Sequence, residues 1–327
     1  MKIEIMYDNH SRYALNLHHL LRVYVPQGCE ELCTKDILDY CRRTGCSEVL
    51  LFTTSYDAQP SFVDLDQIRI DVERSKAVAD NLRKDGIAVS VNVLQTLGHV
   101  YFPRKMDREF PFHRRVYSDG RKSTEGACPL CPNLREWIAS AYRLYAELNP
   151  RILFVDDDYR TFMQGLSCFC ERHLEEMSNV AGRTITRQEV VLALKDSNWP
   201  PDPLRIVFHE VTTKGLCELA RSIREAIHSV SPGTRIGLMA CRPPTGEMGM
   251  DIACITAELA GPHQPLVRPQ SGMYSEGFIR DIPHHFMETD WLRAIVPPEF
   301  EQYPEIENYH YTSYAKSAQC TFVQMAT

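Results

Sequence analysis

The order of apolar and polar residues along the chain predicts strands and helices that alternate. Short apolar runs rich in β-branched residues, such as EVLLF at 48–52 and IAVSVNVL at 87–94, are typical of buried strands. Longer stretches place apolar residues three or four positions apart, and EELCTKDILDYCRRT at 30–44 is a helix of this kind, ended by Gly45. We expect strands that begin near residues 22, 48, 87, 152, 235, 265 and 304.

The segments between these strands are predicted to be helices, with one exception. We expect helices at 30–44, 66–85, 133–148, 171–180, 251–259, 278–294 and 312–326, and a broad helical stretch from 186 to 230 that prolines interrupt at 200, 201 and 203. Residues 95–132 show neither the alternation of a strand nor the three-to-four-residue spacing of a helix, and they are predicted to be a long loop. A loop of that length inside a compact domain is usually functional.

Strands and helices that alternate over this length indicate a parallel sheet. Seven strand–helix units are one short of a (β/α)8 TIM-type barrel. The alternative is an open, doubly wound sheet, but neither G-x-G-x-x-G nor G-x-x-x-x-G-K follows any predicted strand. We therefore expect residues 1–327 to form a single barrel domain. Its eighth strand is either supplied by the N-terminal residues or absent because the chain ends early.

Composition and charge narrow the class of protein. The 327 residues are 44% hydrophobic and 24% charged, with a net charge of −7 and no Lys/Arg-rich block, so a nucleic-acid partner is not expected. The first fifteen residues lack the apolar core of a secretory signal, and no apolar run is long enough to span a membrane. Twelve cysteines then indicate a cytoplasmic protein with free thiols or metal ligands rather than disulfides.

Three adjacent carboxylates, Asp156, Asp157 and Asp158, follow the predicted strand ILFV. Like charges so close together are costly to bury, and catalytic residues of barrels lie at the carboxyl ends of the strands. Glu305 and Glu307 end the seventh predicted strand, three places away around a barrel. Carboxylates that face each other across a barrel mouth are the groups that hydrolyse glycosides. The alternative is a solvated acidic turn whose Asp side chains cap a helix.

Cysteine and histidine form a second pattern, Cys128-x2-Cys131 followed by Cys168-x-Cys170-x2-His173. Zinc in a structural site takes four such ligands, and three Cys with one His are a normal set. One cysteine is in excess, so the upstream ligand is either Cys128 or Cys131. The alternative is a group of free thiols with a surface histidine.

The segment VDDDYR at 155–160, followed by SCFCERH at 167–173, resembles the fourth-strand region of glycoside hydrolase family 42 β-galactosidases and their clan A barrel relatives. In that family the strand ends in a segment like I-D-N-E-Y, whose Glu is the acid/base. A Cys-x-Cys-x2-Cys follows and holds a structural zinc with an earlier Cys. The resemblance covers most of the chain from Arg22 onward, but only this middle motif is specific, and Asp158 replaces the family's Glu.

The resemblance implies a retaining β-galactosidase-like enzyme that acts on a small, neutral carbohydrate. Asp158 would be the acid/base, with a pKa raised by its two Asp neighbours, and Glu307 the nucleophile, with Glu305 as second choice. Structural Zn²⁺ would be bound by Cys128, Cys168, Cys170 and His173. Other side chains predicted to contact the sugar are Asp156, Asp157, Tyr159, Arg160, Trp199, Asn308 and Tyr309.

Two other interpretations stay open. The nucleophile could be one of Asp156–Asp158, as in α-galactosidase-like barrels that use an Asp at the fourth strand. Alternatively, the barrel binds a carbohydrate or a metal ion without catalysis. No expected partner is a nucleic acid or a membrane, and assembly into a homo-oligomer is left open.

Overall fold

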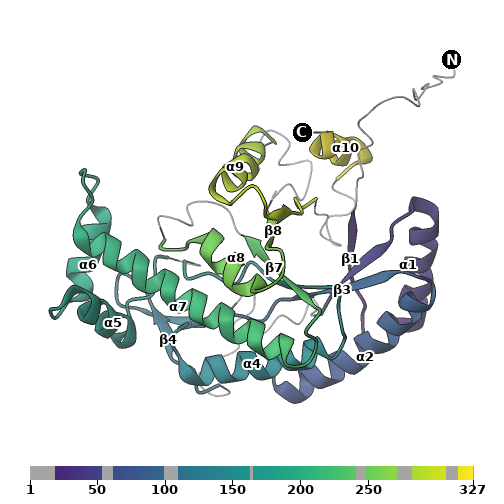
Figure 1. Cartoon of the computed structure of the whole chain (residues 1–327), viewed down its shortest axis with the longest axis horizontal. Helices are drawn as coiled ribbons and strands as arrows, with labels where there is room; N and C mark the ends of the chain where they lie inside the picture. Colours follow the sequence, from purple (N-terminus) through teal and green to yellow (C-terminus); the bar gives the residue numbers. More distant parts are fainter. Residues whose placement is uncertain are drawn as a thin grey trace.

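A curved sheet of parallel strands forms the centre of the protein (Figure 1). The computed structural model describes residues 19–53, 62–98, 110–162, 165–240, 248–270, 282–306 and 316–326. Seven strands pair in chain order and all in parallel: β1 Leu20–Tyr24, β2 Glu48–Phe52, β3 Ala88–Val93, β6 Ile152–Val155, β7 Arg235–Ala240, β8 Leu266–Pro269 and β9 Glu301–Gln302. The predicted fold, an incomplete (β/α)8 barrel, is confirmed.

The last strand begins slightly earlier than predicted. The sequence pattern indicated a strand near residue 304, whereas β9 begins at Glu301. Its backbone continues to pair with β8 beyond Gln302, because the Tyr303 N–H donates to the Val267 carbonyl at 3.0 Å and the Glu305 N–H donates to the Pro269 carbonyl at 3.1 Å. Glu305 is therefore placed at the carboxyl end of this seventh strand.

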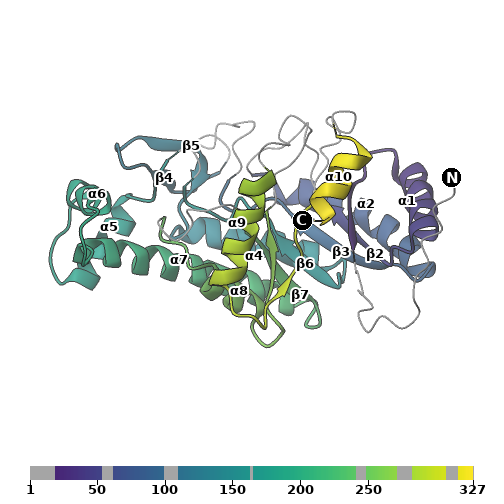
Figure 2. The same ribbon diagram turned by 90° about the horizontal axis from the view of Figure 1, so that it is seen from above.

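Helices alternate with the strands along the chain, and most of them cover one face of the sheet or lie beyond one end of it (Figure 1). They are α1 Glu30–Thr44, α2 Leu65–Lys84, α4 Pro132–Ala146, α5 Glu171–Ala181, α6 Arg187–Lys195, α7 Pro203–His228, α8 Ile252–Ala260, α9 Ile282–Ile295 and α10 Ala318–Ala326. In Figures 1 and 2, α5, α6 and the start of α7 lie at the end of the molecule opposite α1. No helix among the described ranges has both the length and the apolarity to cross a membrane.

Alternating side chains divide the sheet into two faces. Leu153 and Val155 of β6 pack on the helix side, in the largest apolar cluster. Ile152 and Phe154 lie on the opposite side with Leu50, Met239 and Leu266, which form the small core of the barrel interior. A residue that continues an interior row beyond a strand end therefore projects into the barrel mouth.

Gly237 of β7 makes room in that small interior core. A Cβ atom at this position would lie 2.1 Å from Leu266 Cδ2 and 2.8 Å from Phe154 Cε1. No rotamer change of a flexible chain end could relieve both contacts, since both neighbours are buried. The barrel interior is thus closely packed at this level.

Part of the predicted long loop 95–132 forms a hairpin instead. β4 Arg114–Val116 and β5 Lys122–Ala127 pair antiparallel, and Tyr117 forms a bridge to Ser167. The prediction of a loop was wrong here because the strands RRV and KSTEGA contain few apolar residues and show no clear alternation. The hairpin lies next to the cysteine-rich segment after β6.

Candidate functional site

Four interior rows of side chains end in polar residues at the barrel mouth. In each row, a polar residue lies two positions after an interior side chain and on the same face of the sheet. The pairs are Ser90 and Asn92 in β3, Phe154 and Asp156 at the end of β6, Leu266 and Arg268 in β8, and Tyr303 and Glu305 after β9. The Asn92 amide donates to Asp156 Oδ2 at 2.9 Å. Arg268 lies between the two carboxylates, with one guanidinium nitrogen 3.3 Å from Glu305 Oε2 and the other 3.9 Å from Asp156 Oδ1.

Arg268 was not among the predicted site residues, yet it is the central cation of the mouth. Its side chain is buried, and burial alone would lower the pKa of the guanidinium. The carboxylates of Glu305, Asp157 and Asp156 outweigh burial and raise that pKa, so Arg268 remains charged. A buried charge of this kind is stable only when opposite charges surround it.

An ion pair joins the first and the last described strand at the mouth. Arg22 of β1 lies 3.4 Å from Glu305 Oε1, and its guanidinium stacks over the Phe52 ring at 4.7 Å. β1 and β9 share no backbone pairing in the described part of the chain. The pair therefore bridges the opening of the barrel with side chains, where a closed barrel has hydrogen bonds.

Asp158, the predicted acid/base, is buried and hydrogen-bonded to the loop after β3. Its side chain is only 1% exposed. One oxygen accepts from the Thr96 hydroxyl at 2.6 Å, and the other accepts from the Thr96 N–H at 2.9 Å and the Gly98 N–H at 3.4 Å. Asp158 thus attaches the segment after β6 to the loop after β3.

Burial raises the pKa of Asp158 well above its ordinary value, and the charges of Asp156 and Asp157 raise it further. The hydrogen bonds from Thr96 lower it, but less than burial raises it. The direction agrees with the expectation for a proton donor. The main cause differs from the predicted one, since desolvation exceeds the effect of the neighbouring charges.

The other predicted sugar contacts divide between the mouth and other regions. Asp157 forms an ion pair with Arg160 at 3.3 Å, with 14% of the Asp157 side chain exposed. The Tyr159 hydroxyl donates to the Leu216 carbonyl inside the helix-side core. Trp199 is 90% exposed in the segment between α6 and α7, at the end of the molecule opposite α1. Glu307, Asn308 and Tyr309 lie outside the described residues.

The predicted metal ligands come together. Sγ of Cys128, Cys168 and Cys170 and one ring nitrogen of His173 all lie within 4.8 Å of one another. His173 Nδ1 is 3.4 Å from both Cys128 and Cys170, whose sulfurs are 3.6 Å apart. Cys131 points elsewhere and accepts a hydrogen bond from the His113 N–H at 3.2 Å. Of the two candidates for the upstream ligand, the structure selects Cys128.

The electrostatics of this cluster favour a cation. Burial lowers the pKa of His173, but the thiols of Cys168 and Cys170 raise it to about 10. Hydrogen bonds from Cys128 and Cys168 lower the pKa of Cys170, whereas hydrogen bonds with Cys168 and Cys170, together with burial, raise the pKa of Cys128. Three sulfurs and one imidazole nitrogen at these separations fit a tetrahedral metal ion such as zinc. The cluster can therefore hold a metal ion.

The β4–β5 hairpin connects the cysteine cluster to the Asp segment. The Val116 N–H donates to Cys168 Sγ at 3.5 Å. Its neighbour Arg115 is fully buried and donates to the Arg160 carbonyl at 2.7 Å. Gly126 leaves space for this guanidinium, since a Cβ there would lie 2.0 Å from it. The hairpin therefore contacts both the cysteine cluster and the segment that follows Asp157 and Asp158.

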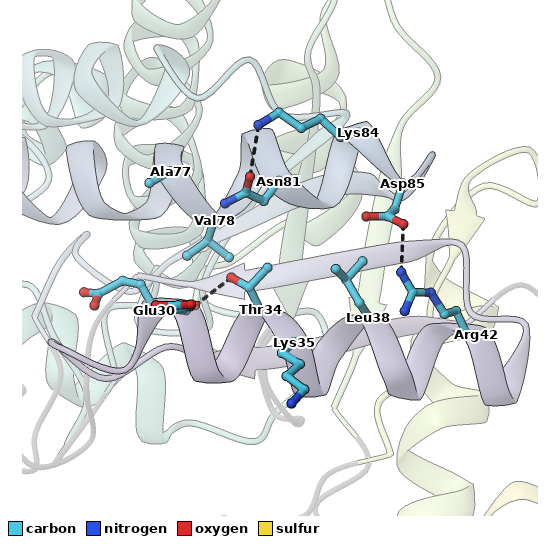
Figure 3. A pocket seen from close by; sticks show the side chains of 11 residues that line it. Glu30, Thr34, Lys35, Leu38, Arg42, Ala77, Val78, Asn81, Lys84 and Asp85 are labelled. Atoms are coloured by element: carbon cyan, nitrogen blue, oxygen red, sulfur yellow. Dashed lines mark hydrogen bonds and ion pairs between the residues drawn. The ribbon is translucent and has the colours of Figure 1, made fainter.

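A groove of about 450 Å³ lies away from the mouth, between α1 and α2 (Figure 3). Its rim is made of paired polar side chains: Arg42 lies 2.9 Å from Asp85, and Lys84 donates to Asn81 at 3.1 Å. Helix faces, not strand ends, form its walls. It is therefore not part of the candidate site.

Comparisons with known proteins support the fold. No protein-family model and no curated protein sequence matches the chain. A β-galactosidase from the psychrophilic Marinomonas ef1 has a similar structure, with a TM-score of 0.59, 12% identity, and coverage of 95% of this chain and 52% of the other. The catalytic domain of β-amylase from Paenibacillus polymyxa has a TM-score of 0.51 and 10% identity, and the match covers 88% of this chain and 86% of that domain. The β-galactosidase of Bacillus circulans sp. alkalophilus has a TM-score of 0.50 and 15% identity, and the match covers 77% of this chain and 39% of that enzyme.

These similarities confirm the predicted resemblance at the level of the fold. The chain is an incomplete barrel of the type found in family 42 β-galactosidases. It spans about half of the length of the Marinomonas enzyme and less of the Bacillus enzyme. Identities of 10–15% are evidence for a shared fold only, so the roles of individual side chains are inferred from this structure.

Proposed function

We propose that this protein is a glycoside hydrolase that cleaves a small, neutral, β-galactoside-like sugar with retention of configuration. One observation carries the proposal: carboxylates from the ends of the fourth and seventh strands, Asp156 and Glu305, converge on Arg268 in the barrel mouth. Paired carboxylates at strand ends are the apparatus of this reaction. The fold shared with β-galactosidases supports the same class.

In the proposed reaction, Glu307 attacks the anomeric carbon while a carboxylic acid of the Asp triplet protonates the leaving oxygen. The same group then takes a proton from the water that hydrolyses the glycosyl-enzyme. Glu307 follows Glu305 by two residues, so an extended chain would place both side chains on the same face. Asp156, Asp157, Arg160, Asn308 and Tyr309 are the proposed sugar contacts, whereas Trp199 would contact only a substrate that extends far from the mouth.

Asp158 is the proposed proton donor because its pKa is raised, as a general acid requires. Direct transfer also requires that the carboxyl group reach the sugar. Asp158 can do so only when its bonds to Thr96 open, whereas Asp157 is already partly exposed. Catalytic hydrogen bonds often form only in the complex with substrate, and the leaving-group dependence of turnover distinguishes the two carboxyl groups.

Turnover of aryl glycosides, including an aryl β-galactoside, tests both roles. We expect Glu307→Gln to lower kcat at least about 1,000-fold, and substitution of the exposed Glu299, Glu299→Gln, to leave it unchanged. Undiminished turnover by Glu307→Gln would exclude this residue as nucleophile. Asp158→Asn and Asp157→Asn are compared on substrates with good and poor leaving groups. The variant of the true donor loses about 100- to 10,000-fold on poor leaving groups and much less on good ones.

A second candidate has support from one specific contact. Asp156 projects into the interior at the end of the fourth strand, where α-galactosidase-like barrels have an Asp nucleophile. In that case an aryl α-galactoside would be cleaved and the β-anomer would not, and Asp156→Asn would abolish turnover.

We further propose that the ion of the Cys128, Cys168, Cys170 and His173 cluster is Zn²⁺ in a structural role. When bound, it would hold the segment before α4 to the start of α5. The abundance of free thiols in the described residues supports a cytoplasmic protein. The proposed partner is the small carbohydrate, with no nucleic acid or membrane, and one domain is proposed for the whole chain.

A further inference from the structure

Two cysteines outside the site lie in contact between neighbouring helices. Sγ of Cys217 on α7 and Sγ of Cys254 on α8 are 3.0 Å apart. Cys217 is buried at 6% exposure, whereas Cys254, the third residue of α8, is exposed. A disulfide has its sulfurs about 2.05 Å apart, so the two atoms need to approach by only about 1 Å.

Contacts on both sides of the cysteine pair fix α7 against α8. One turn before Cys217, the Thr213 hydroxyl donates to the Gly249 carbonyl at 2.9 Å and accepts from the Asp251 N–H at 3.3 Å. One turn after the pair, Arg221 lies 2.9 Å from Glu258. Figure 1 shows the two helices side by side. These contacts therefore hold the two cysteines next to each other, as a cross-link between the helices requires.

We propose that Cys217 and Cys254 are a modification site at which a low-molecular-weight disulfide, such as glutathione disulfide, generates a reversible intramolecular disulfide. The thiolate of exposed Cys254 attacks one sulfur of the oxidant, and one thiol leaves. Cys217 loses its proton to solvent and attacks Cys254 Sγ, which releases the second thiol. Two protein thiols are oxidised to one disulfide, and one small disulfide is reduced to two thiols.

The environment of the pair sets the order of these steps. Burial, the contact with Cys254 and the charges of Glu258 and Asp251 raise the pKa of Cys217. Cys217 therefore stays protonated and hidden until the exposed partner has reacted. The carbonyl of Leu216, next to Cys217, accepts the hydrogen bond from Tyr159 that follows the Asp triplet. The cross-link would thus fix the part of α7 that supports the mouth.

The test uses the full chain with its metal bound, first reduced and then incubated with excess glutathione disulfide. Free thiols are alkylated and the protein is digested and mapped by mass spectrometry without reduction. We expect a peptide pair joined through Cys217 and Cys254, with the loss of two hydrogen atoms. Melting of the oxidised chain should shift upward by about 5–10 °C, and dithiothreitol should reverse the shift.

Three variants serve as controls, each compared with its own reduced form. Cys217→Ser and Cys254→Ser should lose both the joined peptide and the shift in melting temperature. Cys33→Ser, which removes a half-buried thiol on α1, should keep both. The proposal is overturned if Cys217 and Cys254 remain alkylatable after oxidation, or if Cys254 carries only glutathione. The proposal would also be contradicted if the only joined peptides contained Cys128 or Cys170 and none joined Cys217 to Cys254.

Discussion

At the scale of the residue, Arg268 is the buried cation that balances the negative charge of Asp156 and Glu305 in the barrel mouth. The sequence did not reveal it because Arg268 stands inside the short apolar run LVRP. The period of two in a strand does place Arg268 on the same face as Leu266. Its pairing with Asp156 and Glu305, however, depends on the order and curvature of the four strands from β6 to β9, which no local pattern specifies.

Arg268→Met should be strongly destabilising. It leaves two buried carboxylates without their shared cation, a loss of about 3–5 kcal/mol in the free energy of unfolding. Urea denaturation followed by circular dichroism measures this loss. Arg293→Met removes an exposed arginine paired with Asp290 on α9 and should change stability by less than about 1 kcal/mol. Equal effects of the two substitutions would contradict the role given to Arg268.

Asp158 should give the stability of the protein a characteristic pH dependence. Its folded-state pKa is raised above the unfolded value of about 3.9. The stability that its proton contributes is therefore fully present below pH 3.9, and is lost as the pH rises from there through the folded-state pKa.

Asp158→Asn cannot titrate and isolates this contribution. We expect the unfolding free energy of the wild type minus that of the variant to fall as the pH rises above about 4, by up to about 1.4 kcal/mol per unit. Urea denaturation at several pH values measures the difference. A difference that grows with pH would show that Asp158 is stabilised in its ionised form.

At the scale of the element, the cysteine cluster was largely predictable. The spacings restricted the ligands to five candidates, and zinc chemistry required four. The choice of Cys128 over Cys131 was not predictable, because it depends on the turn before α4, where Cys131 instead accepts from His113. The hairpin that holds Cys168 also escaped prediction, since its strands are short and polar.

Metal analysis and a matched pair of variants test the cluster. The purified chain should contain one zinc per molecule, measured by plasma mass spectrometry. Cys170→Ala should lose the ion and about 3–4 kcal/mol of stability, the amount gained from an ion present at 100 to 1,000 times its Kd. Cys131→Ala removes a buried thiol outside the cluster and should retain the ion. Zinc retained by Cys170→Ala and lost by Cys131→Ala would reverse the ligand assignment.

The small interior core predicts a steric effect in β7. Gly237→Ala places a methyl group against Leu266 and Phe154, so it should destabilise the protein by about 1–3 kcal/mol through overpacking. Gly233→Ala meets nothing within 4 Å and is the control. Thermal melting of both variants measures the effect. A Gly237→Ala protein as stable as the control would mean that the interior core is loosely packed.

At the scale of the whole molecule, the alternation of strands and helices predicted the parallel sheet, and the strand count together with the absence of a Gly-rich phosphate loop favoured a barrel over an open sheet. Each predicted strand start lies within a few residues of an observed strand, because alternating strands and helices leave few other arrangements. How the first and last strands meet could not be predicted. The bridge from Arg22 to Glu305 joins residues 283 positions apart, and only the curvature of the folded sheet brings them together.

The central claim is that a Glu at the end of the seventh strand attacks a sugar in this mouth. The most direct measurement is incubation of the full chain with an activated 2-deoxy-2-fluoro-β-galactoside, followed by peptide mapping. The proposal predicts one covalent glycosyl group on Glu307, absent from Glu307→Gln and unaffected by Glu299→Gln. A chain that hydrolyses aryl β-galactosides without forming this adduct, or that carries the label on Asp156, would contradict it.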